Sequence, residues 1–541
     1  MEFLGIIDWL VVILYFLVIA GISAWSMKKK KDSTQEYFLA DRNLGWFVIG
    51  TSILASNVGS EHVVGLAGTG ASSGLVMGHY ELHSWIALLL GWVFVPFYLR
   101  SKVFTMPEFL ERRYNEKSRW FLSVISLVSY VMTKVSVTVY AGAIVITSFL
   151  GIDFWTGALI LVLLTGIYTV LGGMRAVMYT EALQAMVLIL GSLFLTIVGL
   201  VQLGGWDAMI SSVPKEKLNM FLPLSDPKYP WLGILVSSPI VGIWYWCTDQ
   251  YIVQRTLAAR SETEARRGTI FAAYLKLFPF FIFLIPGLIA AALAATGKIE
   301  LAQADQAFPV MVKSLLPIGL RGLVAGGLLA ALMSSLASVF NSCSTLFTID
   351  VYKKIKPQTS EQQLVLVGRI ATGVVVLLGI LWIPLMKGIS GVLYQYLQSV
   401  QSYLAPPIAA VFLLGVFSQR INGKGALSAL ISGFVVGMVR IVLELNKDSL
   451  TGVLYAFAAL NFLYFCIFLF IFSIAVLIIV SIFTEKPSAE QLNGLTYATT
   501  VAEDKAKSRA SWTTTDLLLS LFVVAFIIGV FIYFSPLGVA G

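Results

Sequence analysis

Long apolar stretches separated by short polar segments recur along the whole chain. A membrane-spanning helix needs about 20 mostly apolar residues, and these stretches reach that length. The pattern predicts fourteen spans, near residues 4–25, 45–70, 75–99, 120–148, 153–171, 177–203, 231–257, 269–295, 309–348, 364–386, 391–417, 425–445, 453–483 and 513–536. We therefore predict an all-α polytopic membrane protein.

The second predicted span is interrupted by polar residues and glycines. Asn57, Glu61 and His62 lie near its middle, and glycines occupy positions 50, 59, 65, 68, 70 and 74. Glycine weakens a helix interior, and broken helices in membranes occur where transporters bind ions and solutes. The alternative is a close-packed helix whose glycines seat a neighbour. Because that alternative leaves the three polar side chains unexplained, we predict a break.

The seventh predicted span carries a similar interruption at Cys247-Thr248-Asp249-Gln250. Paired interruptions at corresponding positions point to a binding site near the bilayer midplane. Five spans in each half would form an inverted five-plus-five repeat with broken first helices. The predicted division is an extra helix and basic loop at 1–44, a first repeat at 45–203, an outer loop at 204–230, a second repeat at 231–417, and further helices at 418–541 with a cytoplasmic loop at 484–512.

Composition and charge agree with a membrane protein. The 541 residues are 58% hydrophobic and 12% charged, against roughly a quarter charged in soluble domains. The run Lys28–Lys31 follows the first span, and alternate loops hold most of the 37 lysines and arginines. This positive-inside pattern explains the net charge of +8 without nucleic acid. It predicts both termini outside, in a plasma membrane or a bacterial inner membrane.

Polar residues inside the spans are candidates for solute binding. Glu81 and Ser84 share a face of the third predicted span, and Lys276 is a charge well inside the eighth. With Asn57 and His62 they offer donors and acceptors, as a polyhydroxylated solute requires. Lys134, in the fourth predicted span, is also a charge that is costly inside a membrane, and the sequence shows no evident partner for it.

Aromatic and amide side chains extend this set. Tyr245 and Trp246 adjoin the second interruption, where rings stack on sugars or gate a pathway; the alternative is an interfacial aromatic belt. Gln398 and Gln401 precede a proline pair and would bind a solute or bridge helices.

An oxygen-rich site is predicted where the ninth span meets the first break. Ser334 and Ser335 share a helix face with Ala331, and a broken helix frees carbonyls such as those of Ala55 and Val58. Five uncharged oxygens form a shell suited to Na⁺. The alternative is that both serines bond only to their own backbone.

Histidines and cysteines suggest little further chemistry. His79 and His83 have i,i+4 spacing, so a transition-metal site is an alternative, although the H-E-x-x-H order is absent. The three cysteines, Cys247, Cys343 and Cys466, lie in apolar segments, which excludes a disulfide framework and a Cys-rich zinc site.

Several ordered motifs carry a family resemblance that runs from about Gln35 to Phe483. These are ASNVGSEHVVGLAGTGASSG, GWVFVPFYLRSKVFTMPEFLERRY, YTVLGGMRAVMYTEALQ, WYWCTDQYIVQRTLAA, LMSSLASVFNSCSTLFTIDVY and SYLAPPIAAVFLLGVF. The chain resembles the sodium/solute symporters, specifically the sodium/glucose cotransporter branch. The resemblance implies the inverted-repeat fold and alternating access driven by a Na⁺ gradient.

The resemblance also implies roles for individual residues. The implied sugar-binding positions are Asn57, His62, Glu81, Ser84, Tyr245, Trp246, Lys276 and Gln398, with Tyr245 also as a gate. The implied Na⁺ ligands are Ala55, Val58, Ala331, Ser334 and Ser335. Members with a second Na⁺ carry an aspartate and a hydroxyl where this chain has Glu181 and Ala337, which favours one Na⁺ per sugar; Glu181 and Ser338 leave that second site open.

The sequence thus predicts a Na⁺-coupled hexose importer, with glucose or galactose as the model solute and Na⁺ as the coupling ion. Its partners would be a small sugar, Na⁺ and the bilayer, and not nucleic acid. Alternatives are a carrier of myo-inositol, another polyol or a small carboxylate, and a sugar-gated sensor or leak. Because no nucleophile–base pair or metal cluster is evident, we expect no enzyme. Neither Glu61 nor Lys134 has an assigned role.

Overall fold

The computed structural model describes residues 4–27, 33–59, 61–386 and 393–541. Within these ranges the chain is helical, with no strand and one isolated bridge between Leu44 and Ala259. The predicted all-α fold is confirmed. Lys28–Lys31, which the charge argument uses, lie outside the described residues.

Helices α1 to α13 and their π-helical segments cover the first half of the chain. They are α1 (Ile6–Met27), α2 (Thr34–Leu39), α3 (Trp46–Asn57), η2 (Glu61–Leu66), α4 (Ala67–Ser73), α5 (Gly78–Glu81), α6 (Ser84–Leu89), η3 (Leu90–Phe94), α7 (Val95–Ser101), α8 (Met106–Arg113), α9 (Glu116–Ser129), η4 (Tyr130–Val135), α10 (Ser136–Leu150), α11 (Phe154–Leu203), α12 (Trp206–Ser212) and α13 (Lys215–Leu218).

The second half of the chain also consists of α-helices with short π-helical segments between them. Its elements are α14 (Trp231–Gly242), η5 (Ile243–Thr248), α15 (Gln250–Leu257), α16 (Glu262–Leu275), η6 (Phe280–Leu284), α17 (Ile285–Ala295), η7 (Ala304–Gln306), α18 (Ala307–Leu315), α19 (Leu320–Thr345), η8 (Leu346–Tyr352), α20 (Lys353–Ile355), α21 (Glu361–Met386), α22 (Leu393–Phe417), α23 (Gly423–Leu445), α24 (Gly452–Ala459), α25 (Phe462–Ile482), α26 (Ala489–Leu492), α27 (Ala502–Ala510) and α28 (Thr514–Tyr533).

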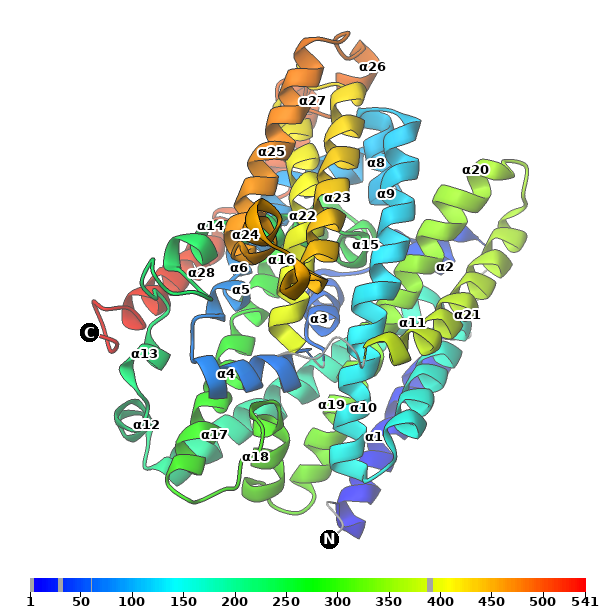
Figure 1. Ribbon diagram of the computed structural model, residues 1–541. Helices are drawn as coiled ribbons and strands as arrows, with labels where there is room; N and C mark the ends of the chain where they lie inside the picture. Colours follow the sequence, from blue (N-terminus) through cyan, green and yellow to red (C-terminus); the bar gives the residue numbers. More distant parts are fainter. Residues whose placement is uncertain (1–3, 28–32, 60, 387–392) are drawn as a thin grey trace.

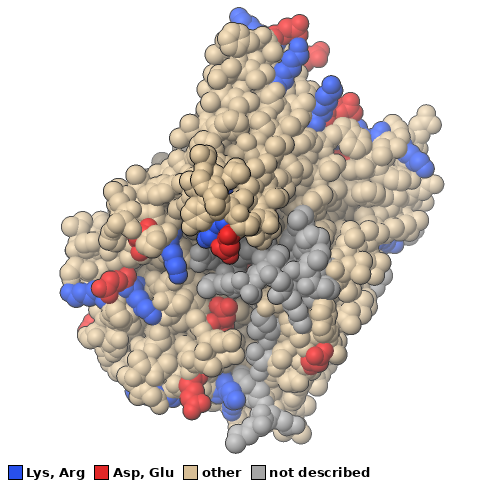
Figure 2. All heavy atoms as spheres, viewed as in Figure 1, with Lys and Arg blue, Asp and Glu red and all other residues tan. Residues whose placement is uncertain are grey.

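Twelve segments of the described chain are long and apolar enough to cross a membrane. Two further predicted spans, 45–70 and 153–171, contain shorter apolar helices at Trp46–Asn57 and Phe154–Ile167. The count of fourteen therefore stays a prediction. Many large apolar side chains are exposed along these segments, as expected for surfaces that face lipid. Figure 2 shows a face that is largely uncharged, with charged side chains in scattered groups at its ends, along its left side and near its centre.

Four predicted boundaries are wrong. The loop expected at Arg175 is helical, because α11 runs unbroken from Phe154 to Leu203. The span expected at 309–348 is two helices, since α18 ends at Leu315 and α19 starts at Leu320. The span expected at 453–483 is also divided, into α24 and α25. The third span is interrupted between α5 and α6, so Glu81 and Ser84 do not share one continuous helix. Hydropathy alone does not show where a short turn divides a span or where one helix continues from one span into the next.

Helix α19 is the centre of the molecule, and nearly all of its residues are buried. Helices α11, α1, α3 and α21 pack around it. The carboxylate of Asp8 in α1 accepts the N–H groups of Gly319 at 2.6 Å and Gly322 at 3.0 Å. Because these are orphan donors at a helix N-terminus, the extra first helix anchors the start of α19.

Several of the segments predicted to be cytoplasmic lie toward one end of the molecule. Helices α8, α20, α26 and α27, which belong to those segments, lie toward the top of Figure 1, whereas the N-terminus, α12 and α18 lie toward the bottom. The polar segment 484–512 includes two short helices and is not only a loop. The C-terminal segment contacts the predicted outer loop, since Met220 donates to the carbonyl of Phe534 at 2.9 Å.

Candidate functional site

Both predicted helix breaks are present. Helix α3 ends at Asn57, and Val58 has extended φ and ψ angles of −87° and 105° before the π-helical segment η2 starts at Glu61. In the second half η5 ends at Thr248, and Asp249 is extended at −78° and 127° before α15. π-Helical turns frequently occur at functional sites. The two breaks are therefore confirmed as local structure.

A small cavity lies between the breaks. It is lined by Asn57, Glu61, His62, Tyr80, Glu81, His83, Val241, Gly242, Tyr245, Trp246, Lys276, Tyr394, Leu397, Gln398 and Gln401. Its volume is about 50 Å³, enough for a few water molecules at about 10–15 Å³ each. A hexose is larger, so side chains must move apart to admit one. Seven of the eight predicted sugar-binding residues line this cavity; Ser84 is fully buried and does not.

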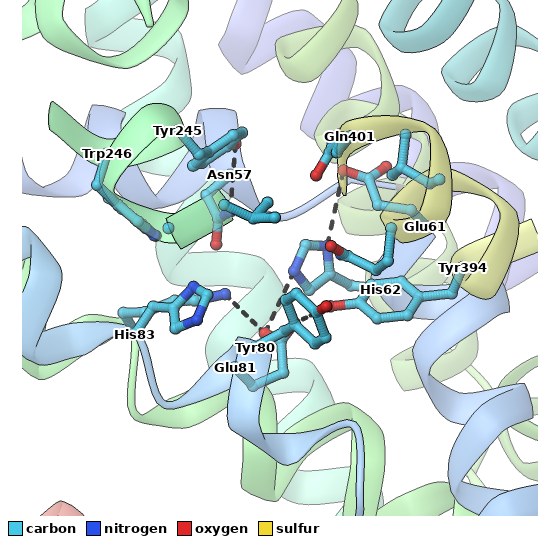
Figure 3. A pocket seen from close by; sticks show the side chains of 15 residues that line it. Asn57, Glu61, His62, Tyr80, Glu81, His83, Tyr245, Trp246, Tyr394 and Gln401 are labelled. Atoms are coloured by element: carbon cyan, nitrogen blue, oxygen red, sulfur yellow. Dashed lines mark hydrogen bonds and ion pairs between the residues drawn. The ribbon is translucent and has the colours of Figure 1, made fainter. Parts of the chain in front are cut away.

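Glu81 is the hub of the cavity. Its carboxylate accepts from Nζ of Lys276 at 2.6 Å and from the hydroxyl of Tyr394 at 2.6 Å. Nε2 of His62 lies 3.3 Å from the same carboxylate, without good hydrogen-bond alignment. Glu81 and Lys276 are 1% and 2% exposed, so burial is compensated by pairing. Figure 3 shows His62, Glu81 and Tyr394 converging.

Aromatic rings face the opposite side of the cavity. Nδ2 of Asn57 donates to the hydroxyl of Tyr245 at 3.2 Å, which ties the first break to the second (Figure 3). Trp246 is 1% exposed, and Nζ of Lys276 lies 5.8 Å from its ring. Both rings come from η5 and line the cavity, with Trp246 buried and Tyr245 half-buried.

Several buried polar atoms around the cavity have no hydrogen-bond partner among the described residues. They are Oδ1 of Asn57, Oε2 of Glu61, Nε2 of His62, the hydroxyl of Tyr80, Nε2 of His83 and Oε1 of Gln398. An unsatisfied buried polar group costs about 1–3 kcal/mol. The set mixes donors and acceptors, so a solute with several hydroxyl groups can satisfy it.

Lys134 has a partner that the sequence did not reveal. Its ammonium forms an ion pair with Asp249, at the second break. The rings of Tyr251, Tyr245, Tyr130 and Trp244 lie 4.0–5.6 Å from the same nitrogen. Cation–π contacts and an opposite charge together stabilise a desolvated ammonium. Lys134 therefore connects η4 to the wall behind the cavity.

The five oxygens predicted to bind Na⁺ lie close together where α19 meets the end of α3. Oγ of Ser334 is 3.1 Å from the carbonyl oxygen of Ala55 and 2.8 Å from that of Ala331. Oγ of Ser335 is 3.4 Å from the carbonyl oxygen of Val58. The hydroxyls thus contact both helices and not only their own backbone. The oxygen set fits Na⁺, which is coordinated at broken helices by freed backbone carbonyls and helix C-terminal ends.

Glu181 and Ser338 lie in a separate polar cluster that contains an arginine. Nη2 of Arg255 is 3.0 Å from Oε1 of Glu181, and both side chains are almost fully buried. Ser338 hydrogen-bonds to both charged groups. A guanidinium therefore already neutralises this carboxylate.

The two histidines with i,i+4 spacing have different surroundings. His79 hydrogen-bonds to the carbonyl of Met220 at 2.9 Å and stacks on Phe531, whereas His83 lines the cavity. Within the described ranges, no group of three or more His, Cys, Asp or Glu side chains is arranged to hold a metal.

Some lining residues carried no assigned role in the sequence. Tyr80 and Tyr394 are new, His83 was considered only as a metal ligand, and Tyr394 is the most important because it binds Glu81. The available signal was the YQYLQSVQ segment, in which Tyr394, Gln398 and Gln401 recur at helical spacing.

Broken helices around a buried polar cavity, beside an oxygen-rich site, define a membrane transporter. The sodium:solute symporter family model matches residues 37–433. Sodium/glucose cotransporter 1 of Ovis aries is 39% identical over 527 residues, covering 89% of this chain and 79% of the relative. Sodium/myo-inositol cotransporter 2 of Homo sapiens is 40% identical over 533 residues, covering 91% and 79%. The chain belongs to the sodium:solute symporter family.

Solved structures support the fold. A Na⁺-coupled sialic acid symporter in a substrate-bound outward-open state has a TM-score of 0.76 at 22% identity, covering 90% of this chain and all of that one. A nucleobase-cation-symport-1 family transporter in a closed conformation has a TM-score of 0.55 at 13% identity. The protein is a multi-pass Na⁺-coupled solute symporter, and its family and relatives are transporters, not enzymes.

Proposed function

We propose that this protein imports a hexose such as glucose or galactose with one Na⁺ per sugar, by alternating access. The observation that carries the proposal is the cavity, in which several buried donors and acceptors have no hydrogen-bond partner among the described residues. A sugar offers hydroxyl groups to these atoms and an apolar ring face to the aromatic wall. The relatives named sodium/glucose cotransporters support this solute class.

The proposed sugar ligands are Asn57, His62, Glu81, Lys276 and Gln398, with Trp246 packing on the ring. Tyr245 is the proposed gate, since its hydroxyl bonds to Asn57 and its ring contacts the Lys134 ammonium. Ser84 does not line the cavity in this arrangement, and its buried hydroxyl has no hydrogen-bond partner among the described residues, so we propose that it becomes a sugar ligand only when the cavity opens.

The proposed Na⁺ ligands are the carbonyls of Ala55, Val58 and Ala331 and the hydroxyls of Ser334 and Ser335. The carbonyls of Ala55 and Val58 border the break that also carries Asn57 toward the cavity. Na⁺ would therefore order the same short segment that the sugar contacts, which is a direct route for coupling.

One Na⁺ per sugar is supported by the cluster around Glu181. A second Na⁺ there would have to share the carboxylate with Arg255, and two cations at one acid repel each other. We further propose the inverted repeat at 45–203 and 231–417, with both termini outside, as the arrangement that lets the site open alternately to each side.

Myo-inositol is the second candidate solute. The human relative named a sodium/myo-inositol cotransporter is 40% identical, about as similar as the glucose relatives. Inositol also carries hydroxyls on a six-membered ring, so the same cavity chemistry suits it.

Uptake by purified protein in liposomes tests the proposal. We expect accumulation of labelled glucose or galactose only under an inward Na⁺ gradient, and competition by unlabelled sugars in proportion to their affinity. Uptake that is unchanged in K⁺ would contradict Na⁺ coupling. Competition by myo-inositol but not by hexoses would indicate that myo-inositol is the solute. Sugar-dependent current without accumulation would indicate a sensor or leak.

A further inference from the structure

Glu61 is a cavity acid that the proposed function leaves without a role. Its side chain is 15% exposed, and Oε2 is buried with no hydrogen-bond partner in the described chain. Three other buried acids near the breaks each face a Lys or Arg: Glu81 faces Lys276, Asp249 faces Lys134, and Glu181 faces Arg255. Glu61 lacks such a partner among the described residues.

The neighbouring histidine makes only a loose contact with this acid. Nδ1 of His62 is 3.7 Å from Oε1 of Glu61. The same nitrogen accepts the backbone N–H of Gly59 at 3.4 Å, so it carries no proton in this arrangement. The proton of a neutral ring then lies on Nε2, which faces Glu81. Glu61 therefore has no Lys or Arg in direct contact, and its Oε2 has no hydrogen-bond partner among the described residues.

The carboxylate of Glu61 lies beside the proposed Na⁺ ligands. A Cβ atom built on Gly59 would be 2.5 Å from Oε2 of Glu61 and 2.9 Å from Oγ of Ser335. Because both oxygens lie within 2.9 Å of this one position, the carboxylate of Glu61 and the hydroxyl of Ser335 are close neighbours. Ser335 is the residue whose hydroxyl approaches the carbonyl of Val58. Glu61 thus borders both the cavity and the oxygen cluster.

We propose that Glu61 supplies the negative charge of the Na⁺ site and couples that site to the solute. The proposal rests on the proposed function above. Na⁺ bound among the five oxygens neutralises the carboxylate and fixes its position. The fixed carboxylate then accepts a hydroxyl group of the solute, so Na⁺ raises solute affinity and the solute raises Na⁺ affinity by the same factor. Solutes that present a hydroxyl donor at this point are selected.

Na⁺ binding without solute is the primary test. Thermal unfolding of purified protein is followed while NaCl replaces choline chloride at constant ionic strength. Glu61→Gln keeps the shape and removes the charge, and we expect the half-saturating Na⁺ concentration to rise about tenfold or more. In Na⁺-free buffer the same variant should melt at or above the wild-type temperature, because the unpaired buried charge is gone.

Glu300→Gln is the charge-matched control, since Glu300 is exposed on the loop after α17 and should leave the Na⁺ response unchanged. Glu61→Ala replaces the Gln variant if the latter does not fold, with the same expected loss. Solute affinity at saturating Na⁺ is measured in parallel and should also fall.

Three outcomes overturn the inference. An unchanged Na⁺ response in Glu61→Gln removes the charge from the Na⁺ site. Weaker solute binding with unchanged Na⁺ binding would make Glu61 a solute ligand alone. Equal solute affinity with and without Na⁺ in the wild type would remove coupling through this site. A wild-type protein that takes up solute without Na⁺ contradicts the proposed function instead, so the two failures are distinguishable.

Discussion

Glu81 links residues from three separate parts of the chain. It joins Lys276 after α16, Tyr394 in α22 and His62 in η2, all at contact distance. A carboxylate that is held by two strong donors is oriented before solute arrives, which lowers the entropic cost of binding. Removing one donor leaves the carboxylate partly unpaired and mobile.

Lys276→Met tests this arrangement. The methionine keeps most of the apolar volume but removes the ammonium, leaving a buried acid that lacks its charge partner. We expect sugar transport to fall at least about tenfold, mainly through weaker sugar binding, at roughly 2 kcal/mol for a charged hydrogen bond. Initial uptake rates over a range of sugar concentrations give the measurement. Unchanged sugar affinity would remove Lys276 from the site.

Ser335→Ala tests the proposed Na⁺ ligands. Losing one hydroxyl of five oxygens should cost about 1 kcal/mol and raise the half-saturating Na⁺ concentration about fivefold. Ser342→Ala is a matched control, because Ser342 lies on the same helix and its hydroxyl bonds to the carbonyl of Ser338 at 2.9 Å. If both variants keep wild-type Na⁺ dependence of uptake, Ser335 is not a ligand.

At the scale of elements, two interrupted helices bring distant residues together. A continuous α3 would consume the carbonyls near Val58 in its own hydrogen bonds, and a continuous η5–α15 would bury Asp249 against the helix. The breaks expose those groups to α19 and η4. The extended residues Val58 and Asp249 therefore create both polar sites.

The Lys134–Asp249 pair tests how far the second break depends on its neighbour. Asp249 also accepts the N–H of Tyr251 at 3.2 Å as the N-cap of α15. Lys134→Met leaves a buried carboxylate without its cation, so we expect a loss of about 3 kcal/mol in stability. Combining it with Asp249→Asn should recover part of that loss. Thermal unfolding of the two single variants and the double variant provides the measurement; additive losses would contradict direct coupling.

At the scale of the whole molecule, the coupling ratio decides how steeply solute accumulates. A tenfold Na⁺ gradient supplies about 1.4 kcal/mol and −100 mV adds roughly 2.3 kcal/mol per charge. One Na⁺ per sugar then supports accumulation of about several hundredfold, and two would square that figure. We expect the smaller value, measured as the sugar ratio at which net flux stops. A ratio far above about a thousandfold would contradict a single Na⁺.

Some of this protein was readable from its sequence. Long apolar segments demand burial in lipid, so the helical membrane class follows from hydropathy alone. The breaks were readable for a similar reason, because polar groups such as Asn57 and Asp249 are too costly inside an unbroken lipid-facing helix. The Na⁺ ligands near Ser335 were predicted from helical spacing and family resemblance.

The tertiary structure decided the pairings. Lys134 finds Asp249, Glu81 finds Tyr394, and Glu181 finds Arg255 across long sequence separations. No local pattern encodes such partners, since they depend on how whole helices pack. The stretch around residues 51–74 shows both sides: its sequence determined that the helix must break, because polar groups there need partners. Only packing decided which partners they meet, and that Glu61 lies beside the proposed Na⁺ site without a Lys or Arg partner among the described residues.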